Sequence, residues 1–253
     1  INVASGDLVA GANRVFWKAG GDLWTSDGTT NLKVKSFADA SSFTLTDSGP
    51  QYTESGFYDS NIYTRRSVFV GDTIYFWAST EAMKWNIWKS DGTVAGTVKV
   101  TSQDSPVFDH NMAWAPTNLF LNGTDIYYWN RIQDLNVNTR ELRKLNTLTN
   151  TSTVVANAPT SDICTNGQSY AQQQNFAVVG GKLIFDYEND CNNRVGALNL
   201  TSGAFTDLKP STLAATDQLV VLGPSIFTVF NSKVYFIGTV LTQNELSQNI
   251  HEN

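Results

Sequence analysis

Short runs of β-branched and aromatic residues recur along the chain, separated by turns that contain glycine or asparagine. In the clearest region these runs are 67–70, 73–79, 85–90 and 97–102. Gly71-Asp72 joins the first two runs and Asp91-Gly92 joins the last two, because glycine allows the positive φ of a tight turn. No segment has a clear apolar period of 3.6 residues, so the pattern predicts strands and few helices.

The same unit recurs five times. Its marker is a turn followed by a strand, read as GANRVFW, GDTIYFW, GTDIYYW, GGKLIFD and NSKVYFI. One aromatic position anchors each copy, and the copies lie 51–60 residues apart: Phe16, Phe76, Tyr128, Phe185 and Phe236. A four-stranded antiparallel meander repeated at this spacing is typical of a β-propeller blade. The sequence therefore predicts an all-β fold built of such blades.

The most economical arrangement is one β-propeller domain over residues 1–253, with five blades closed by the N-terminal strand. The expected blades are 6–37, 67–102, 118–156, 175–209 and 225–253 completed by 1–5. The fifth unit has no outer strand of its own, and residues 1–5 would supply it and cover an open edge. The alternative is a fragment of a longer array, whose last blade is completed by further chain or by a neighbouring subunit.

Five tryptophans fall at blade-like positions: Trp17, Trp24, Trp77, Trp88 and Trp129. Packing between blades is the simpler interpretation, since it removes large rings from water. Stacking on a ligand is the alternative.

Two units share a longer phrase, LWTSDGT around Trp24 and IWKSDGT around Trp88. The Ser-Asp-Gly-Thr part reads as the turn from the third strand to the outer strand. The phrase resembles the ELW-x-x-DGT-x-x-GT repeats of large bacterial surface and secreted proteins, with the trailing Gly-Thr kept only as Gly96-Thr97. That resemblance implies propeller architecture and export, and it carries no catalytic residues.

The composition indicates an exported protein. Charged residues make up 16% of the chain, against about 25% in average soluble domains. The net charge is −6, and the largest basic cluster is the Arg65-Arg66 pair, which excludes an extended nucleic-acid surface. No apolar run approaches the roughly 20 residues of a membrane helix. The chain begins at Ile1, which we interpret as a processed precursor, and an extracellular or cell-surface location is expected.

Cys164 and Cys191 both lie in polar, asparagine-rich segments. We expect a disulfide between them, formed in an oxidising compartment, with two free thiols as the alternative. Together with the two distant histidines they lack the ligand spacing of a zinc site. Three N-glycosylation sequons begin at Asn122, Asn150 and Asn199.

Three connections are long, namely 38–66, 103–117 and 156–175. Each joins an outer strand to the innermost strand of the next blade, so we expect all three on one face, where long loops commonly bind ligands. Rings stack on sugars, while amides and carboxylates bond hydroxyl groups. The predicted ligand-binding residues are Tyr52, Tyr58, Tyr63, Arg65, Asp109, His110 and Trp114. The alternative is that they are ordinary surface residues covering the blade ends.

The sequence favours a non-catalytic binding or assembly module that recognises a glycan or a surface protein. One alternative is a structural subunit of an extracellular filament or surface layer, self-assembled through its terminal strands. The other is a propeller glycoside hydrolase, which needs paired carboxylates. Its candidates are Glu54, Asp109, Asp186 and Glu188. No nucleophile elbow, phosphate-cradling loop or metal-ligand motif occurs, so no cofactor is expected.

Overall fold

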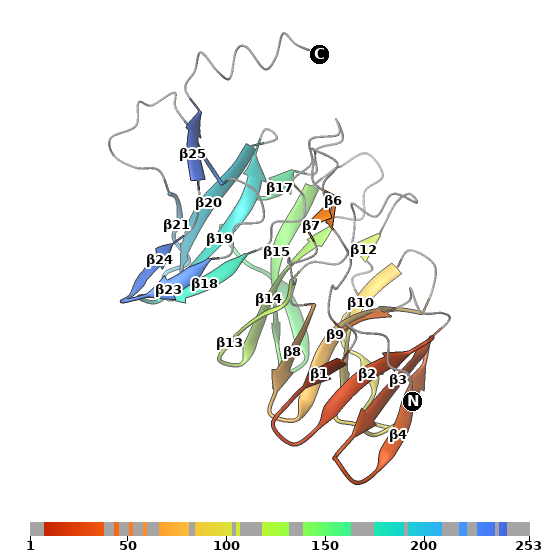
Figure 1. Cartoon of the computed structure of the whole chain (residues 1–253). Helices are drawn as coiled ribbons and strands as arrows, with labels where there is room; N and C mark the ends of the chain where they lie inside the picture. The colour runs from red at the N-terminus through yellow and green to blue at the C-terminus, as the bar shows by residue number, and fades with distance from the viewer. Residues whose placement is uncertain are drawn as a thin grey trace. The chain divides into compact units, whose positions relative to one another are not determined.

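A computed structural model describes most of the chain. The described residues are 8–37, 43–45, 51–52, 58–59, 66–80, 84–102, 105–106, 118–131, 139–162, 175–189, 192–208, 218–221, 227–235 and 238–241. Within these ranges all regular secondary structure is β-strand (Figure 1). The chain divides into two compact units, 1–137 with 143–154 and 138–142 with 155–253.

Four consecutive antiparallel meanders, here called blades 1 to 4, follow the chain order (Figure 1). Blade 1 comprises β1 (Leu8–Ala10), β2 (Val15–Ala19), β3 (Asp22–Ser26) and β4 (Asn31–Ser36). Blade 2 comprises β8 (Ser67–Val70), β9 (Thr73–Ser79), β10 (Lys84–Ser90) and β11 (Val98–Lys99). Blade 3 comprises β13 (Phe120–Asn122), β14 (Asp125–Arg131), β15 (Thr139–Asn146) and β16 (Thr151–Val154). Blade 4 comprises β18 (Phe176–Val179), β19 (Lys182–Asn189), β20 (Asn192–Asn199) and β21 (Phe205–Asp207).

These meanders confirm the predicted fold class, an all-β protein of propeller-type blades. The number of blades and the single-domain ring stay predictions. Residues 1–5, expected to close the ring, lie outside the described residues.

In the fifth region the sequence pattern alone predicts one strand over 233–240, KVYFIGTV, and the structure differs from it. β24 (Lys233–Tyr235) pairs with β23 (Thr228–Phe230), whereas β25 (Gly238–Leu241) pairs with β22 (Gln218–Val221). The apolar run is continuous in sequence, so its period cannot show where the pairing partner changes. A glycine inside a strand pattern, as at Gly238, often marks such an interruption.

The register of the repeats also differs from the prediction in blade 1. Trp17 lies opposite Trp24, and Phe76 lies opposite Trp88. Trp17, rather than Phe16, is therefore the counterpart of Phe76. Counting five residues on from the turn glycine, which leads to Phe16 in one unit and Phe76 in the other, therefore misplaces the counterpart by one position.

The core of the first unit lies between successive blades. Blades 1 and 2 bury one cluster, which includes Phe16, Leu23, Phe76 and Trp88. A second cluster between blades 2 and 3 consists of Tyr75, Trp77, Ile87, Leu119, Ile126, Tyr128 and Leu145. Trp77 and Trp88 thus pack between blades, as the simpler interpretation predicted. In the second unit, Ile184, Val195 and Ala197 of blade 4 pack with Phe227.

The turn between the third and fourth strands has the same chemistry in all four blades. One side-chain oxygen accepts hydrogen bonds from backbone N–H groups two or three residues further on, at distances of 2.8–3.1 Å. The acceptors are Asp27, Asp91, Asn146 and Asn199. This confirms that Ser-Asp-Gly-Thr makes a turn, and asparagine replaces aspartate in blades 3 and 4.

The charge of the turn aspartate makes the stability of the fold depend on pH. Hydrogen bonds from Thr30 and Thr29 lower the pKa of Asp27 from 3.8 to about 2. A lowered pKa stabilises the fold above about pH 4, and that contribution disappears as pH falls towards the folded value. Asp27→Asn should therefore be less stable than the wild type at pH 7, and the difference should shrink between pH 4 and pH 2. Urea unfolding at a series of pH values measures it.

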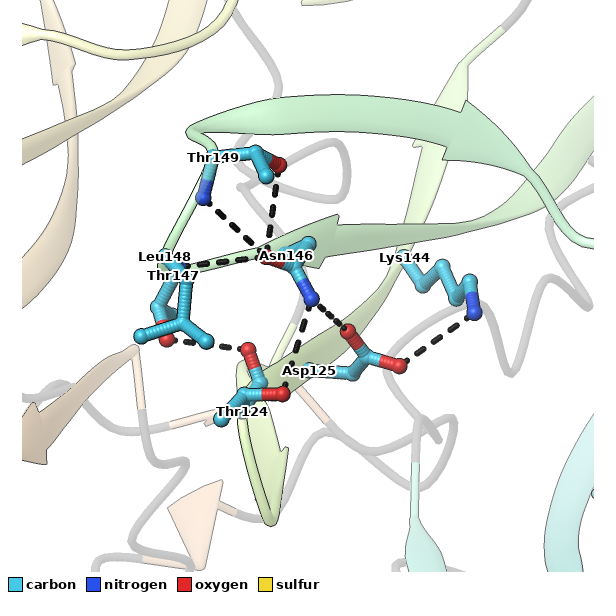
Figure 2. Close-up of polar contacts among 7 residues, drawn as sticks. All are labelled: Thr124, Asp125, Lys144, Asn146, Thr147, Leu148 and Thr149. Atoms are coloured by element: carbon cyan, nitrogen blue, oxygen red, sulfur yellow. Dashed lines mark hydrogen bonds and ion pairs between the residues drawn. The ribbon is translucent and has the colours of Figure 1, made fainter.

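The reverse substitution in blade 3 provides the matched control. Asn146 Nδ2 donates to Asp125 Oδ1 at 2.9 Å, and Lys144 Nζ lies 3.2 Å from Asp125 Oδ2 (Figure 2). Asn146→Asp removes that donor and sets two carboxylates together, so its destabilisation should be largest at neutral pH and be relieved by acid. A destabilisation of either variant that stays unchanged as the pH falls from 7 to 2 would contradict this account of the turns.

Candidate binding site

Blades 1 and 2 are joined at the end where the short turns lie. Asn13 donates from its backbone N and its Nδ2 to the Asp72 carboxylate, at 3.1 and 3.0 Å. These bonds, aided by the positive charge of Arg14, lower the pKa of Asp72. A bond from Thr93 and the same Arg14 charge lower the pKa of Asp91. The bonds between Asn13 and Asp72 therefore join the two blades, whereas the bond between Thr93 and Asp91 lies within one turn of blade 2.

The opposite end of blade 2, where β9 ends and β10 begins, is here called the loop end. β5 (Phe43–Thr44) pairs with the last residues of β9, placing Phe43 opposite Ala78. β12 (Ser105–Pro106) pairs with the first residues of β10, placing Ser105 opposite Trp85. Because β9 and β10 are antiparallel neighbours, the long segments 38–66 and 103–117 both attach at the same end of this sheet.

The third long segment attaches to blade 3 in the same way as the second attaches to blade 2. β17 (Ser161–Asp162) pairs with the first residues of β15, Thr139 and Arg140. A short strand after the outer strand thus returns to the start of the third strand in both blades.

The attachment of the first segment is fixed by burial and hydrogen bonds. Phe43 is 1% exposed, and its ring centroid lies 4.7 Å from that of Phe37. Lys18 Nζ donates to the Phe43 carbonyl at 3.0 Å and lies 5.1 Å from the centre of its ring. Ser67 Oγ donates to the Leu45 carbonyl at 2.8 Å. The point where this segment leaves the sheet is therefore held from both sides.

Buried polar groups fix the other two attachments. Thr101 Oγ1 accepts from the Ile87 N–H at 2.9 Å and donates to Asn86 Oδ1 at 3.1 Å, beside the start of 103–117. At the end of 156–175, Asn175 donates from N and Nδ2 to Asp186, at 2.7 and 3.1 Å. Asp186, considered above for hydrolysis, is 1% exposed and acts here as an acceptor for the loop.

Trp85 is the one half-buried tryptophan among the described residues of the loop end. It packs partly against the cluster between blades 2 and 3, and it lies opposite Ser79 on β9 and Ser105 on β12. Trp85 is not among the residues that the sequence predicts for ligand binding. The orientation of Trp85 could have been predicted from the sequence. Trp85 and Trp88 are three residues apart in a strand, so their side chains must point to opposite faces of the sheet.

The predicted ligand-binding residues fall largely outside the described residues. Tyr52 in β6 (Gln51–Tyr52) and Tyr58 in β7 (Tyr58–Asp59) are directly opposite each other in a short antiparallel pair. The other predicted residues lie outside the described ranges: Tyr63, Arg65, Asp109, His110 and Trp114, together with Cys164, Cys191 and Glu54. The three sequon asparagines are described, Asn122 in β13, Asn150 in an exposed turn and Asn199 at the end of β20.

No helix in the described part of the chain is long and apolar enough to cross a membrane. No family model matches the sequence, and no curated protein matches it.

Several solved β-propeller structures are similar to the chain. The GH74 xyloglucanase from Xanthomonas campestris has a TM-score of 0.47 at 14% identity, covering 92% of this chain and 38% of the enzyme. A TolB-type protein from Agrobacterium tumefaciens has a TM-score of 0.44 at 9% identity, covering 92% and 81%. TolB from Acinetobacter baumannii has a TM-score of 0.37 at 12% identity, covering 92% of this chain and half of TolB. At such scores the likeness carries no inference about activity, and the chain spans about half or less of two of the three proteins.

Proposed function

We propose that the chain is an exported, non-catalytic binding module that recognises a glycan at the loop end of blade 2. The observation that carries the proposal is the attachment of two long segments, through β5 and β12, at the same end of one rigid sheet. Long loops on a rigid scaffold are where binding residues concentrate. The pairing of β17 in blade 3 extends the same arrangement to the third segment.

The residue types at this end favour a sugar over an apolar ligand. Trp85 supplies a partly accessible ring, and Tyr52 and Tyr58 lie opposite each other in the first long segment. Amphipathic rings present an apolar face and a polar edge, which suits a pyranose with one apolar face and hydroxyl groups around its rim. Asp109, His110 and Trp114 in the second segment would add polar contacts and a further ring.

Export, the disulfide and the closed ring belong to the same proposal. The low charge content and the resemblance to bacterial surface repeats support export. A bond between Cys164 and Cys191 would then tie the third long segment to the connection between β19 and β20. One domain of five blades remains the arrangement that we propose for the whole chain.

A glycan array followed by calorimetry with the best ligand tests the proposal. Trp85→Ala should weaken binding at least about 10-fold, since a stacked aromatic anchor typically contributes more than 1 kcal/mol. Trp85→Phe should recover most of the affinity because it retains a ring. Leu148→Ala, a substitution in an exposed turn of blade 3, should leave affinity unchanged.

Thermal unfolding of each variant separates lost binding from lost folding. Equal affinity of wild type and a folded Trp85→Ala protein would reject this location for the site. Binding to a protein but to no glycan would keep the loop end as the site and replace the ligand class.

A further inference from the structure

We propose that residues 90–97 of blade 2 form a docking site for an arginine side chain of the preceding blade, and that Arg14 is the residue that occupies it. These residues read Ser-Asp-Gly-Thr-Val-Ala-Gly-Thr and contain the complete repeat phrase, which blade 1 has only in part. The site lies between β10 and β11, so the proposal is independent of glycan binding at the loop end. It gives the phrase a role in joining blades besides making a turn.

The Arg14 side chain lies directly against the backbone of Gly92. A Cβ atom at Gly92 would lie 2.5–2.7 Å from Arg14 Nη1, Cδ and Cζ, closer than real Cβ atoms approach their neighbours. Gly92 is buried, although Asp91 and Thr93 on either side of it are exposed. Glycine is therefore required at this position for the space that Arg14 occupies, as well as for its φ of 86°.

The turn also fixes a carboxylate near this arginine. Thr93 donates to Asp91 Oδ1 from its backbone N at 2.8 Å and from its Oγ1 at 2.7 Å. Gly96 leaves room for the Asp91 carboxylate, which a Cβ atom at Gly96 would meet. Gly96 N donates to Thr93 Oγ1 at 2.9 Å, and Thr97 Oγ1 donates to the Thr93 carbonyl at 2.6 Å. The trailing Gly-Thr therefore orders the aspartate on which the charge of Arg14 acts.

The turn of blade 1 that carries Arg14 makes two further contacts with blade 2. A Cβ atom at Gly11 would lie 2.9 Å from the ring of Phe69 on β8, so this glycine allows a close approach. Asn13 makes the two bonds to the Asp72 carboxylate described above. The backbone before Arg14 is therefore held on blade 2, and its side chain reaches Gly92 from a fixed position.

The charges at the site match a basic side chain. Hydrogen bonds from Asn13 and Thr93, together with the positive charge of Arg14, lower the pKa values of Asp72 and Asp91 respectively. Both carboxylates belong to blade 2 and the cation belongs to blade 1, so the attraction acts across the boundary between the blades. Arginine suits this place because its guanidinium group is planar and always charged.

Blade 1 has the first half of the phrase without a docked arginine. Its Asp27-Gly28-Thr29 is followed by Thr30 and β4 rather than by a Gly-Thr pair. Gly28 has a φ of 90°, close to that of Gly92. It is exposed, and no described residue lies within 4 Å of a Cβ atom placed there. The two glycines therefore share one backbone requirement and differ in the presence of Arg14, which makes Gly28 the matched control.

Urea unfolding of Gly92→Ala and Gly28→Ala, each in the wild type and in Arg14→Ala, tests the proposal. Both substitutions impose the same strain at positive φ, but only Gly92→Ala also displaces Arg14. Gly92→Ala should raise the unfolding equilibrium constant at least about 3-fold more than Gly28→Ala, within the range of coupling between contacting residues. In the Arg14→Ala background the two substitutions should have equal effects. Equal effects in the wild type, or an excess that persists without Arg14, would overturn the proposal.

NMR titration of the aspartate carboxyl groups tests the charge of the docked side chain separately. Arg14→Ala should raise the pKa values of Asp91 and Asp72 and leave that of Asp27 unchanged, because Asp27 lies in the turn without a docked arginine. Arg14→Lys keeps the positive charge, so it should return the pKa of Asp91 towards its wild-type value. A pKa of Asp91 that Arg14→Ala leaves unchanged, or an equal rise at Asp27, would overturn the proposal.

Discussion

Replacing Phe43 with alanine should lower the free energy of unfolding of the first unit by about 3–5 kcal/mol. Phe43 is fully buried and contacts the rings of Phe37 and Phe76, at centroid distances of 4.7 and 6.3 Å. Alanine leaves a cavity because these neighbours belong to two different blades and cannot both collapse into it. Lys18 also loses the ring over which its ammonium group lies. Equilibrium unfolding in urea, followed by tryptophan fluorescence, measures the loss.

The same substitution should release the first long segment from the loop end of blade 2. Hydrogen exchange of the Thr44 amide should therefore become faster in Phe43→Ala than in the wild type. Leu148→Ala, on the exposed turn of blade 3, is the control and should change stability by less than about 0.5 kcal/mol. A loss below about 1 kcal/mol for Phe43→Ala would show that β5 does not depend on this burial.

A signal for β5 was present in the sequence, in the alternating Phe-Thr-Leu-Thr run at 43–46. The run is shorter than an ordinary strand and lies within a polar segment, so the sequence pattern alone predicts a loop there. Its partner, at Trp77 and Ala78 of β9, is more than thirty residues away. Local periodicity cannot identify such a partner, whereas the hairpins of blade 2 could be predicted because their strands are neighbours in sequence.

The limits of local sequence pattern also explain why the register of blade 1 could not be predicted. The glycine that begins the hairpin turn is visible in the sequence, but the pairing of β2 with β3 is a property of the folded backbone. Counting from that glycine places Phe16, one position before Trp17, at the position of Phe76. In a strand such a shift exchanges the two faces, so it assigns a side chain to the wrong blade interface.

The candidate site could be predicted only as a location. Tyrosines, aspartates and a tryptophan in long connections indicated where a ligand would bind. The residues that hold those connections, Lys18, Thr101 and Asp186, act on groups distant in sequence or buried, and their own neighbours give no sign of this. Holding the attachment points of loops lowers the ordering cost of binding, so these residues support recognition without touching the ligand.

The second large loss of stability is expected when Asp186 is replaced. Its position on β19 corresponds to Trp77 on β9, so a carboxylate replaces a buried aromatic residue of the repeat. The carboxylate accepts two bonds from Asn175, which ends the third long segment. Asp186→Ala leaves both donors without this acceptor in a buried place, so stability should fall by about 3 kcal/mol. Urea unfolding of the full chain measures it.

Two further variants separate the role of Asp186 from a general loss of charge. Asp186→Asn keeps one acceptor oxygen and should cost clearly less than Asp186→Ala. Asp22→Ala removes a carboxylate of blade 1 that is paired with Lys33 at 3.4 Å on the surface, and it should cost less than about 1 kcal/mol. If Asp186→Ala were no worse than Asp22→Ala, the bonds to Asn175 would not be what fixes the third segment. If Asp186→Ala is much more destabilising than Asp22→Ala, the Asp186 carboxylate occupies a position that is aromatic in blade 2 because it fixes the third long segment.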